Sequence, residues 1–162
     1  MKVRELMTQK VLTVSPDDSL DKVFFLFNFE NIRHLPVLED EKIVGIVSDR
    51  DLKKALGSSE AFRGKLKSIP FNIPSKKVAA IMRKDVLVTE PGERAADVAA
   101  VMVAKKIGVL PVAQNDKLVG IISAIDILKA FVGVCNSLEQ VDFKSFGHLL
   151  NQLESVTKLK KS

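Results

Sequence analysis

Two short segments of the sequence pair a hydroxyl with a carboxylate at the same spacing. Each has a serine at the end of an apolar run and an aspartate three residues later: Ser48 with Asp51, and Ser123 with Asp126. Free N–H groups in the first turn of a helix attract anions, and a hydroxyl at the cap position adds a donor. A carboxylate accepts two hydrogen bonds side by side, which matches the adjacent hydroxyls of ribose. These residue types at this spacing indicate a nucleotide site.

The same spacing has a simpler interpretation, in which each serine caps a helix and the aspartate supports the cap without any ligand. A single Ser-x-x-Asp segment would favour this interpretation. The repetition favours the site, because both segments follow the same Val-Gly-Ile strand. Gly45 and Gly120 within these strands indicate a close approach by a ligand or by neighbouring backbone. Both interpretations stay open at this point.

The two segments belong to two copies of a longer unit. Residues 3–56 (the first copy) align with residues 78–131 (the second copy) without a gap, and 18 of the 54 positions are identical. Ordinary composition would give only about three or four identities. The chain is therefore a tandem duplication.

Each copy predicts the same order of elements. A short apolar run comes first, at residues 11–14 and 86–89, and a proline turn and a helix of about a dozen residues follow. Two β-rich runs separated by a polar break of three or four residues then predict a hairpin, at 35–48 and 110–123. A second helix ends the unit, which is therefore β-α-β-β-α.

The two copies should fold as a pair. The strands that hold the glycines are apolar throughout, so both faces should be covered, and a unit of about 55 residues cannot bury that much surface alone. We expect a mixed α/β (α+β) fold in which the copies pack about a pseudo-two-fold axis and leave a pair of equivalent crevices, where small ligands bind. The predicted boundaries are domains at 1–57 and 78–133, a linker at 58–77 and a C-terminal helical tail at 134–162.

Composition and charge exclude several functions. The net charge of +5 is mild, bases and acids are interspersed, and no Trp or Tyr offers a stacking surface, so we expect no nucleic-acid partner. No apolar run reaches the roughly 18 residues of a membrane span, and the start lacks the features of a signal peptide, so we expect a cytoplasmic protein with no membrane partner. A lone Cys135 and two histidines supply no nucleophile–base set, so we expect no catalysis, no metal and no required cofactor.

The motifs together resemble a known family. The segments LPVL…KIVGIVSDRD and LPVA…KLVGIISAID, preceded by MT or MR and by VLTVSPD or VLVTEPG, look like two cystathionine β-synthase (CBS) domains that form a Bateman module. The resemblance spans residues 1–133 and is closest to stand-alone pairs of the AcuB type. It implies binding of adenosine-containing ligands, such as AMP, ADP, ATP, NAD or S-adenosylmethionine, and association into dimers.

The resemblance also assigns roles by position. It makes the two serines donors to phosphate and the two aspartates acceptors for the ribose, and it places the adenine edge against the backbone around Thr13 and Thr89. The ligand-binding residues that it implies are Thr13, Arg33, His34, Pro36, Ser48, Arg50, Asp51, Thr89, Gly108, Pro111, Ser123 and Asp126.

The two copies differ in charge around this site. Where the first copy has Arg33, His34 and Arg50, the second has uncharged residues. We therefore expect unequal sites, one able to hold a phosphorylated nucleotide and the other weak, empty or suited to a less charged adenosyl group. For His34, a structural role at the start of a strand is an equally good interpretation. For Arg50, the alternative is a solvent-exposed position on a helix.

The first helices of the two copies differ in bulk. The helix at 19–31 has four phenylalanines, which cover more than one face, whereas the helix at 94–106 is rich in alanine. We expect a homodimer whose interface uses both helices. The alternative is that these side chains fill a larger hydrophobic core within one chain. The tail is expected to be an amphipathic helix. The spacing of its apolar residues does not distinguish whether it caps the dimer, covers a crevice or docks another protein.

The sequence therefore predicts a non-catalytic regulatory module that binds an adenosyl ligand and passes its occupancy to an unidentified regulated protein. The alternative is a structural scaffold, in which the pair only dimerises and the Ser-x-x-Asp segments are caps. An enzyme of acetoin or nucleotide metabolism would need a catalytic constellation that we do not find in the sequence.

Overall fold

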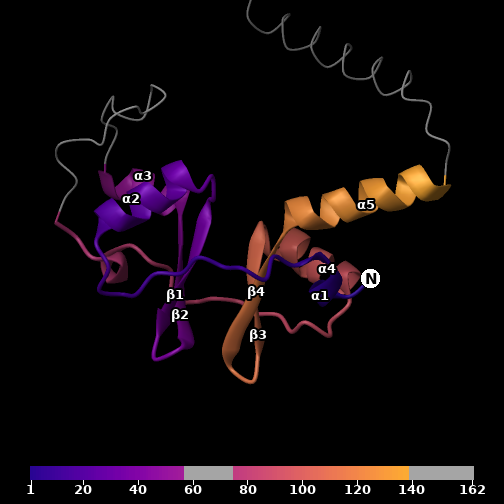
Figure 1. The fold of residues 1–162 in the computed structure, drawn as a ribbon, viewed down its shortest axis with the longest axis horizontal. Helices are drawn as coiled ribbons and strands as arrows, with labels where there is room; N and C mark the ends of the chain where they lie inside the picture. Colours follow the sequence, from indigo (N-terminus) through magenta and orange to yellow (C-terminus); the bar gives the residue numbers. More distant parts are fainter. Residues whose placement is uncertain (57–74, 139–162) are drawn as a thin grey trace, which may run out of the picture. The chain divides into compact units, whose positions relative to one another are not determined.

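The two copies fold into nearly the same succession of elements in the computed structural model, which describes residues 1–56 and 75–138 (Figure 1). The first copy forms α1 (Val3–Leu6), α2 (Leu20–Phe29), β1 (His34–Glu39), β2 (Lys42–Ser48) and α3 (Asp49–Leu56). The second copy forms η2, a single 3-10 turn (Val78–Ala80), followed by α4 (Ala95–Lys105), β3 (Val109–Gln114), β4 (Lys117–Ser123) and α5 (Ala124–Leu138).

The chain divides into two compact units, Met1–Ile127 and Leu128–Ser162. The first unit contains both hairpins and both Ser-x-x-Asp segments. Most of the predicted linker at 58–77, the predicted tail helix beyond residue 138 and His148 lie outside the described residues.

The predicted hairpins are confirmed, with tighter turns than the sequence indicated. β1 pairs with β2 and β3 pairs with β4, both antiparallel. Each turn has only two residues, 40–41 and 115–116, and all four have positive φ angles between 48° and 63°. Left-handed residues at both central positions give a turn whose twist matches that of the strands, and Asp and Asn tolerate this conformation. The register places His34 opposite Ser48, at the strand ends that lead into α3.

The apolar runs at 11–14 and 86–89 are not full strands, which corrects the predicted β-α-β-β-α order. Val14 makes a single parallel bridge with Val37, with hydrogen bonds to Pro36 O and from Leu38 N, and Thr89 makes the equivalent bridge with Val112. A longer parallel ladder would need a donor at the second residue of the Leu-Pro-Val segment, and proline has no N–H. The pairing therefore ends after one bridge.

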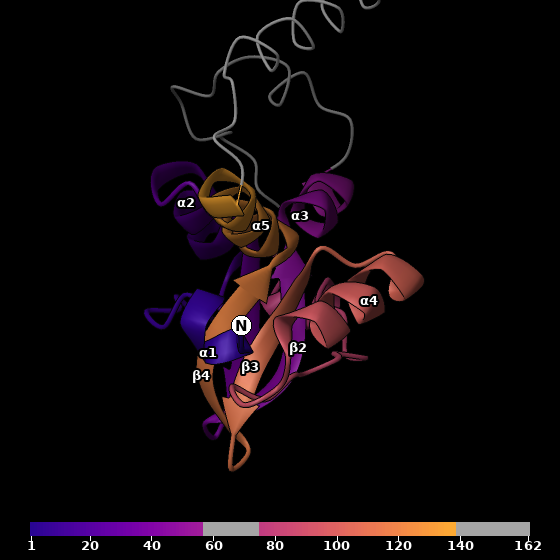
Figure 2. The same ribbon diagram turned by 90° about the vertical axis from the view of Figure 1, so that its right-hand side faces the viewer.

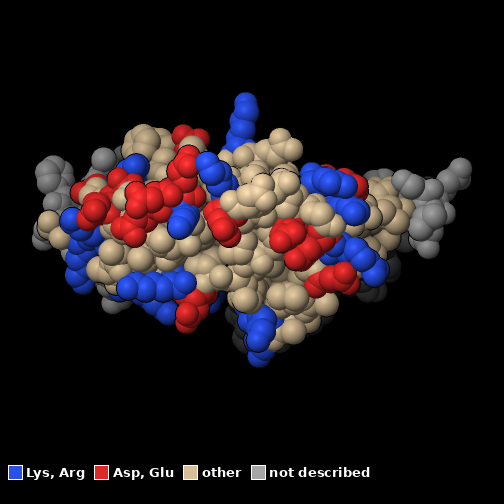
Figure 3. Space-filling model, turned by 90° about the horizontal axis from the view of Figure 1, so that it is seen from below, with Lys and Arg blue, Asp and Glu red and all other residues tan. Residues whose placement is uncertain are grey.

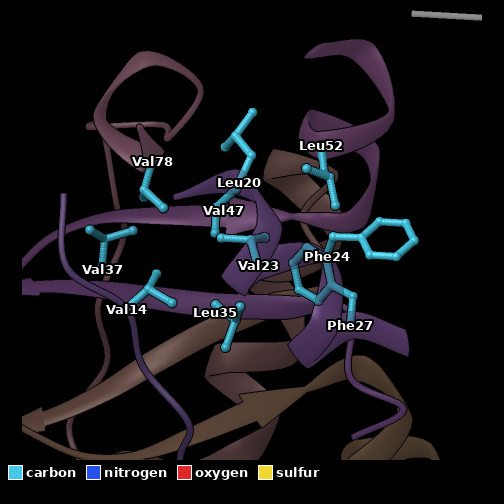
Figure 4. Packing of buried hydrophobic residues seen from close by; sticks show 10 residues of the cluster. All are labelled: Val14, Leu20, Val23, Phe24, Phe27, Leu35, Val37, Val47, Leu52 and Val78. Atoms are coloured by element: carbon cyan, nitrogen blue, oxygen red, sulfur yellow. The ribbon is translucent and has the colours of Figure 1, made fainter. Parts of the chain in front are cut away.

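Each copy has its own hydrophobic core, and each core includes one fully buried residue from the other copy. Figure 4 shows the first core, which consists of Val14, Leu20, Val23, Phe24, Phe27, Leu35, Val37, Val47, Leu52 and Val78. The second core contains Val3, Val98, Met102, Leu110, Val112 and Ile122. Val78 precedes the second copy's helix, yet it is fully buried among first-copy residues, and Val3 is fully buried in the second core.

The segments that carry these two valines, which we call the lead-ins (residues 1–8 and 77–83), are exchanged between the copies. Thr8 bonds Ile121 in both directions at 2.9 Å, so the first lead-in pairs with β4. Arg83 bonds Ile46 at 2.9 and 3.0 Å, so the second lead-in pairs with β2. β2 and β4 lie side by side in Figures 1 and 2 and are in contact. The predicted packing of the copies as a pair is therefore confirmed.

The strand glycines make room for this exchange. A Cβ atom on Gly45 would lie 2.7 Å from Met82 Sδ and 3.1 Å from Arg83 O, and a Cβ on Gly120 would lie 2.6 Å from Met7 Sδ and 3.1 Å from Thr8 O. The predicted close approach is thus made by the opposite lead-in.

Gly45→Ala should therefore destabilise the fold. The added methyl group forces Met82 to move and presses on a backbone oxygen, and such overpacking costs about 1–3 kcal/mol of unfolding free energy. Urea denaturation measures this loss. Combined with Met82→Ala the losses should be less than additive, because the second change removes the side chain in the way. An unchanged denaturation midpoint for Gly45→Ala would contradict the close contact.

Candidate functional site

The Ser-x-x-Asp segments form the same cap at the two helix entrances. Asp51 Oδ2 accepts hydrogen bonds from Ser48 N at 3.0 Å and from Ser48 Oγ, and Asp51 N donates to Ser48 Oγ. In the second copy Asp126 Oδ2 accepts from Ser123 N at 2.8 Å and from Ser123 Oγ at 2.6 Å. The capping interpretation is therefore correct for the helix geometry. It uses only one carboxylate oxygen of each aspartate, so the other remains available for a different partner.

The second carboxylate oxygen distinguishes the two copies. Asp51 Oδ1 accepts from Arg83, with Nη2 at 3.3 Å and Nε at 3.4 Å, and this pair joins the second lead-in to α3. The side chain of Asp51 is 10% exposed and that of Arg83 is 56% exposed. Thr8 stands at the position that corresponds to Arg83, and among the described residues Asp126 makes no ion pair.

The surroundings keep Asp51 ionised. Burial opposes its ionisation, but the hydrogen bonds from Ser48 and the positive charge of Arg83 outweigh that effect, so the pKa of Asp51 lies below its ordinary value. The carboxylate is therefore charged at neutral pH and can accept hydrogen bonds from hydroxyl groups.

The imidazole of His34 lies beside this carboxylate and is mostly neutral at pH 7. Burial lowers its pKa from the ordinary 6.5, the charge of Asp51 opposes the shift, Arg83 and Arg33 add to it, and Asp49 opposes it. The neutral ring can accept as well as donate a hydrogen bond.

The low pKa of His34 predicts a pH effect on stability. The contribution of His34 to the free energy of unfolding is complete above pH 6.5. It is lost as the pH falls through the lower pKa of the folded state, because the unfolded chain then binds more protons than the folded chain. Between about pH 7.5 and pH 5.5 the free energy of unfolding should fall more steeply in the wild type than in His34→Gln. Urea titrations at each pH measure both slopes, and equal slopes would contradict the assignment.

A cavity of about 410 Å³ opens beside Asp51, within the size range of small-molecule sites. Residues of both copies line it, so it is the predicted crevice on the first copy's side. Of the predicted ligand-binding residues, those that line it are Arg33, His34, Ser48, Arg50, Asp51, Gly108 and Pro111. This arrangement combines cations and a helix N-terminus with the carboxylate.

The other predicted residues do not line this cavity. Ser123 and Asp126 lie at the equivalent entrance of the second copy. Pro36 and Thr89 are buried, and Thr89 Oγ1 donates to Glu93 Oε2 at 2.7 Å. Thr13 is half-buried and directly precedes Val14, the residue that makes the bridge equivalent to that of Thr89.

Several other lining residues were not predicted from the sequence, and they come from the second lead-in, from the residues that directly follow it and from the entrance of β3. They are Arg83, Asp85, Val86, Leu87, Lys106 and Ile107, and Asp49 adds a further carboxylate from α3. Thr8 and Arg83 occupy equivalent positions in the two copies, so the difference in charge between them is visible in the sequence. Its importance depends on the exchange of the lead-ins, which the repeat alone does not reveal.

Acidic and basic side chains are interspersed on the face that Figure 3 presents. No helix in the described ranges has the length and apolar character needed to cross a membrane. Within residues 1–56 and 75–138, no three His, Cys, Asp or Glu side chains gather as metal ligands would.

Comparison with known proteins identifies the family. The profile of the CBS domain matches residues 3–58 and 78–133, one match for each copy. The chain belongs to the CBS domain family. Among curated relatives, the uncharacterized protein MJ1225 of Methanocaldococcus jannaschii is 32% identical over 130 residues, which cover 80% of this chain and 46% of that protein. The chain spans about half or less of the length of the first curated relatives that it matches.

Solved structures of CBS pairs have the same fold. The AcuB protein of Vibrio cholerae has a TM-score of 0.69 and 30% identity, over 88% of this chain and 98% of that one. CBSX2 in complex with AMP has a TM-score of 0.67 and 29% identity, over 82% and 97%. The CBS pair of MJ0100 in complex with 5′-methylthioadenosine and S-adenosyl-L-methionine has a TM-score of 0.68 and 26% identity, over 82% and 97%.

Proposed function

We propose that this CBS pair is a non-catalytic regulatory module that binds an adenosine-containing ligand in the cavity beside Asp51. The proposal depends on one observation. A single cavity of ligand size is lined by an ionised carboxylate, three arginines and an apolar wall. The complexes of CBSX2 with AMP and of MJ0100 with two adenosyl compounds support this ligand class. The module acts in the cytoplasm on an unidentified regulated protein.

Each part of the cavity suits one part of such a ligand. The Asp51 carboxylate accepts hydrogen bonds from the ribose hydroxyls, while Arg33, Arg50 and the N-terminus of α3 attract an anionic group. Val86 and Leu87 supply apolar surface for the adenine ring. The ligand therefore bridges both copies, and its influence on a partner equals its differential affinity for two arrangements of the pair.

We expect the second predicted crevice, beside Asp126, to bind more weakly or to take a less charged adenosyl compound. Its helix entrance has the same cap, but it lacks the counterparts of Arg33, Arg50 and Arg83. A calorimetric titration with AMP should therefore show unequal sites, and two equal sites would contradict this part of the proposal.

A thermal-shift screen tests the proposal. AMP has about 23 non-hydrogen atoms, and about 0.3 kcal/mol per atom gives a dissociation constant of roughly 10 μM. At about 1 mM AMP, a hundred times that constant, the fold gains about 2.7 kcal/mol, which raises the melting temperature by roughly 5–10 °C.

The screen uses AMP, ADP, ATP, NAD and S-adenosylmethionine, with inorganic phosphate as the control for binding of a bare anion. A shift with at least one adenosyl compound and none with phosphate supports the proposal. If no adenosyl compound raises the melting temperature, the scaffold function replaces it, because the caps then need no ligand.

We also propose that the chain forms a homodimer through α2 and α4. Phe24 and Phe27 are buried in the first core, but Phe25 and Phe29 are 49% and 66% exposed and stack with ring centroids 4.3 Å apart. On α4, Val103 is 79% exposed. Apolar side chains at this exposure indicate an interaction surface.

Light scattering at micromolar concentration should report a dimer of the wild type and a smaller mass for Phe25→Ser combined with Phe29→Ser. The matched control is Asn28→Ser, which changes an exposed residue of the same helix and leaves the rings in place. A monomeric wild type would end the proposal.

A further inference from the structure

The ion pair of Arg83 with Asp51 occupies the atom that a ribose would need. Asp51 Oδ2 is held by Ser48, so Oδ1 is the carboxylate oxygen free to bind a ligand hydroxyl. Arg83 reaches this oxygen with contacts of 3.3 and 3.4 Å, longer than the roughly 2.7–2.9 Å of strong charge-assisted bonds. Because Arg83 is also 56% exposed, its guanidinium can leave Oδ1 without being buried unpaired.

We propose that Arg83 is the residue that sets the ligand class of this cavity, selecting adenosyl compounds with an anionic 5′ group over neutral ones. This inference rests on the proposed function. A ligand whose ribose takes Oδ1 displaces the guanidinium from its partner. An anionic ligand offers the displaced Arg83 a new ion-pair partner in the same cavity. A neutral nucleoside must also compete with the Arg83–Asp51 ion pair, but it offers Arg83 no replacement partner.

The lining of the cavity has so small a net charge that the loss of Arg83 would make it neutral. The lining contains four cations, Arg33, Arg50, Arg83 and Lys106, and three acids, Asp49, Asp51 and Asp85, so with neutral His34 the sum is +4 − 3 = +1. Without Arg83 the sum is zero. Arg83 is also the lining cation hydrogen-bonded to the proposed ribose acceptor.

The equivalent position in the other copy indicates a suitable substitution for Arg83. Thr8 occupies the position of Arg83 in the other lead-in and makes the same pair of backbone hydrogen bonds with its strand. Threonine at position 83 is therefore compatible with the exchange of the lead-ins. Lys84→Thr is the control, because it removes one positive charge from the adjacent exposed residue, which does not line the cavity.

Calorimetric titrations of the full chain with AMP and with adenosine test the inference. The wild type should prefer AMP. Arg83→Thr should weaken AMP binding by roughly tenfold to a hundredfold and should leave adenosine binding unchanged or stronger, because Oδ1 is then free. Lys84→Thr should keep the wild-type ratio of the two affinities.

Three other outcomes would overturn the inference. Unchanged affinities for both AMP and adenosine in Arg83→Thr would mean that Arg83 does not select, and an equal fall of both affinities would mean that it only supports the fold. If the folded wild type binds neither compound, nor any other of the adenosyl compounds, the proposed function itself fails. The first two results leave the adenosyl site standing, so the failures are distinguishable.

Discussion

Asp51→Ala is expected to weaken AMP binding about 100-fold and to remove most of the AMP-induced rise in melting temperature. The reason is the loss of the carboxylate that accepts hydrogen bonds from the ribose hydroxyls. Two bonds to a charged acceptor at about 1.5 kcal/mol each amount to about 3 kcal/mol. Calorimetry measures the affinity, and the melting temperature without ligand shows whether the variant is folded.

Asp126→Ala is the matched control, because it removes the same cap from the other helix entrance. It should change AMP binding much less than Asp51→Ala does, and the double variant should show no ligand-induced shift with any adenosyl compound. Equal effects of the two single variants would contradict the assignment of the phosphorylated ligand to the first crevice. Full AMP binding by a folded Asp51→Ala would contradict the site itself.

Val78→Asp is expected to unfold the first copy or to leave it barely stable. Val78 is fully buried among Leu20, Val23 and the other residues of the first core, and these offer no partner for a carboxylate (Figure 4). An unpaired buried charge costs more than about 4 kcal/mol, a large part of the 5–15 kcal/mol that stabilises a typical domain. Circular dichroism during urea denaturation measures the loss.

Ala80→Asp tests whether this effect comes from burial. Ala80 lies in the same short turn, but it is exposed, so its change to aspartate should alter the unfolding free energy by less than about 0.5 kcal/mol. Val3→Asp should repeat the large loss, because Val3 is equally buried in the second core. A stable Val78→Asp would contradict the exchange of the lead-ins.

Much of the fold follows from local pattern. The periodicity of apolar residues predicts the helices and the hairpins, since a helix or hairpin buries one face whatever its neighbour is. The repeat predicts two equivalent units, and the continuous apolar strands predict that these units pack together. The turns could be placed at polar pairs such as Asp40–Glu41, although the sequence did not reveal that two residues suffice.

The features that escaped prediction depend on contacts distant in sequence. The runs at 11–14 and 86–89 have strand composition, but the missing N–H of a proline on the neighbouring strand limits each to one bridge. In the site, Ser48 and Asp51 are neighbours along the chain and could be found from spacing. Arg83 lies 32 positions from Asp51, and only the crossing of its lead-in brings it to that carboxylate.

The most direct test of the central claim is a crystal structure of the protein grown with AMP at about a hundred times its dissociation constant, where the site is almost full. The account predicts AMP in the cavity between the copies, with its ribose hydroxyls within hydrogen-bonding distance of Asp51 Oδ1 and its phosphate beside Arg83. Clear density for AMP at another place, or a cavity that holds only solvent at that concentration, would contradict it.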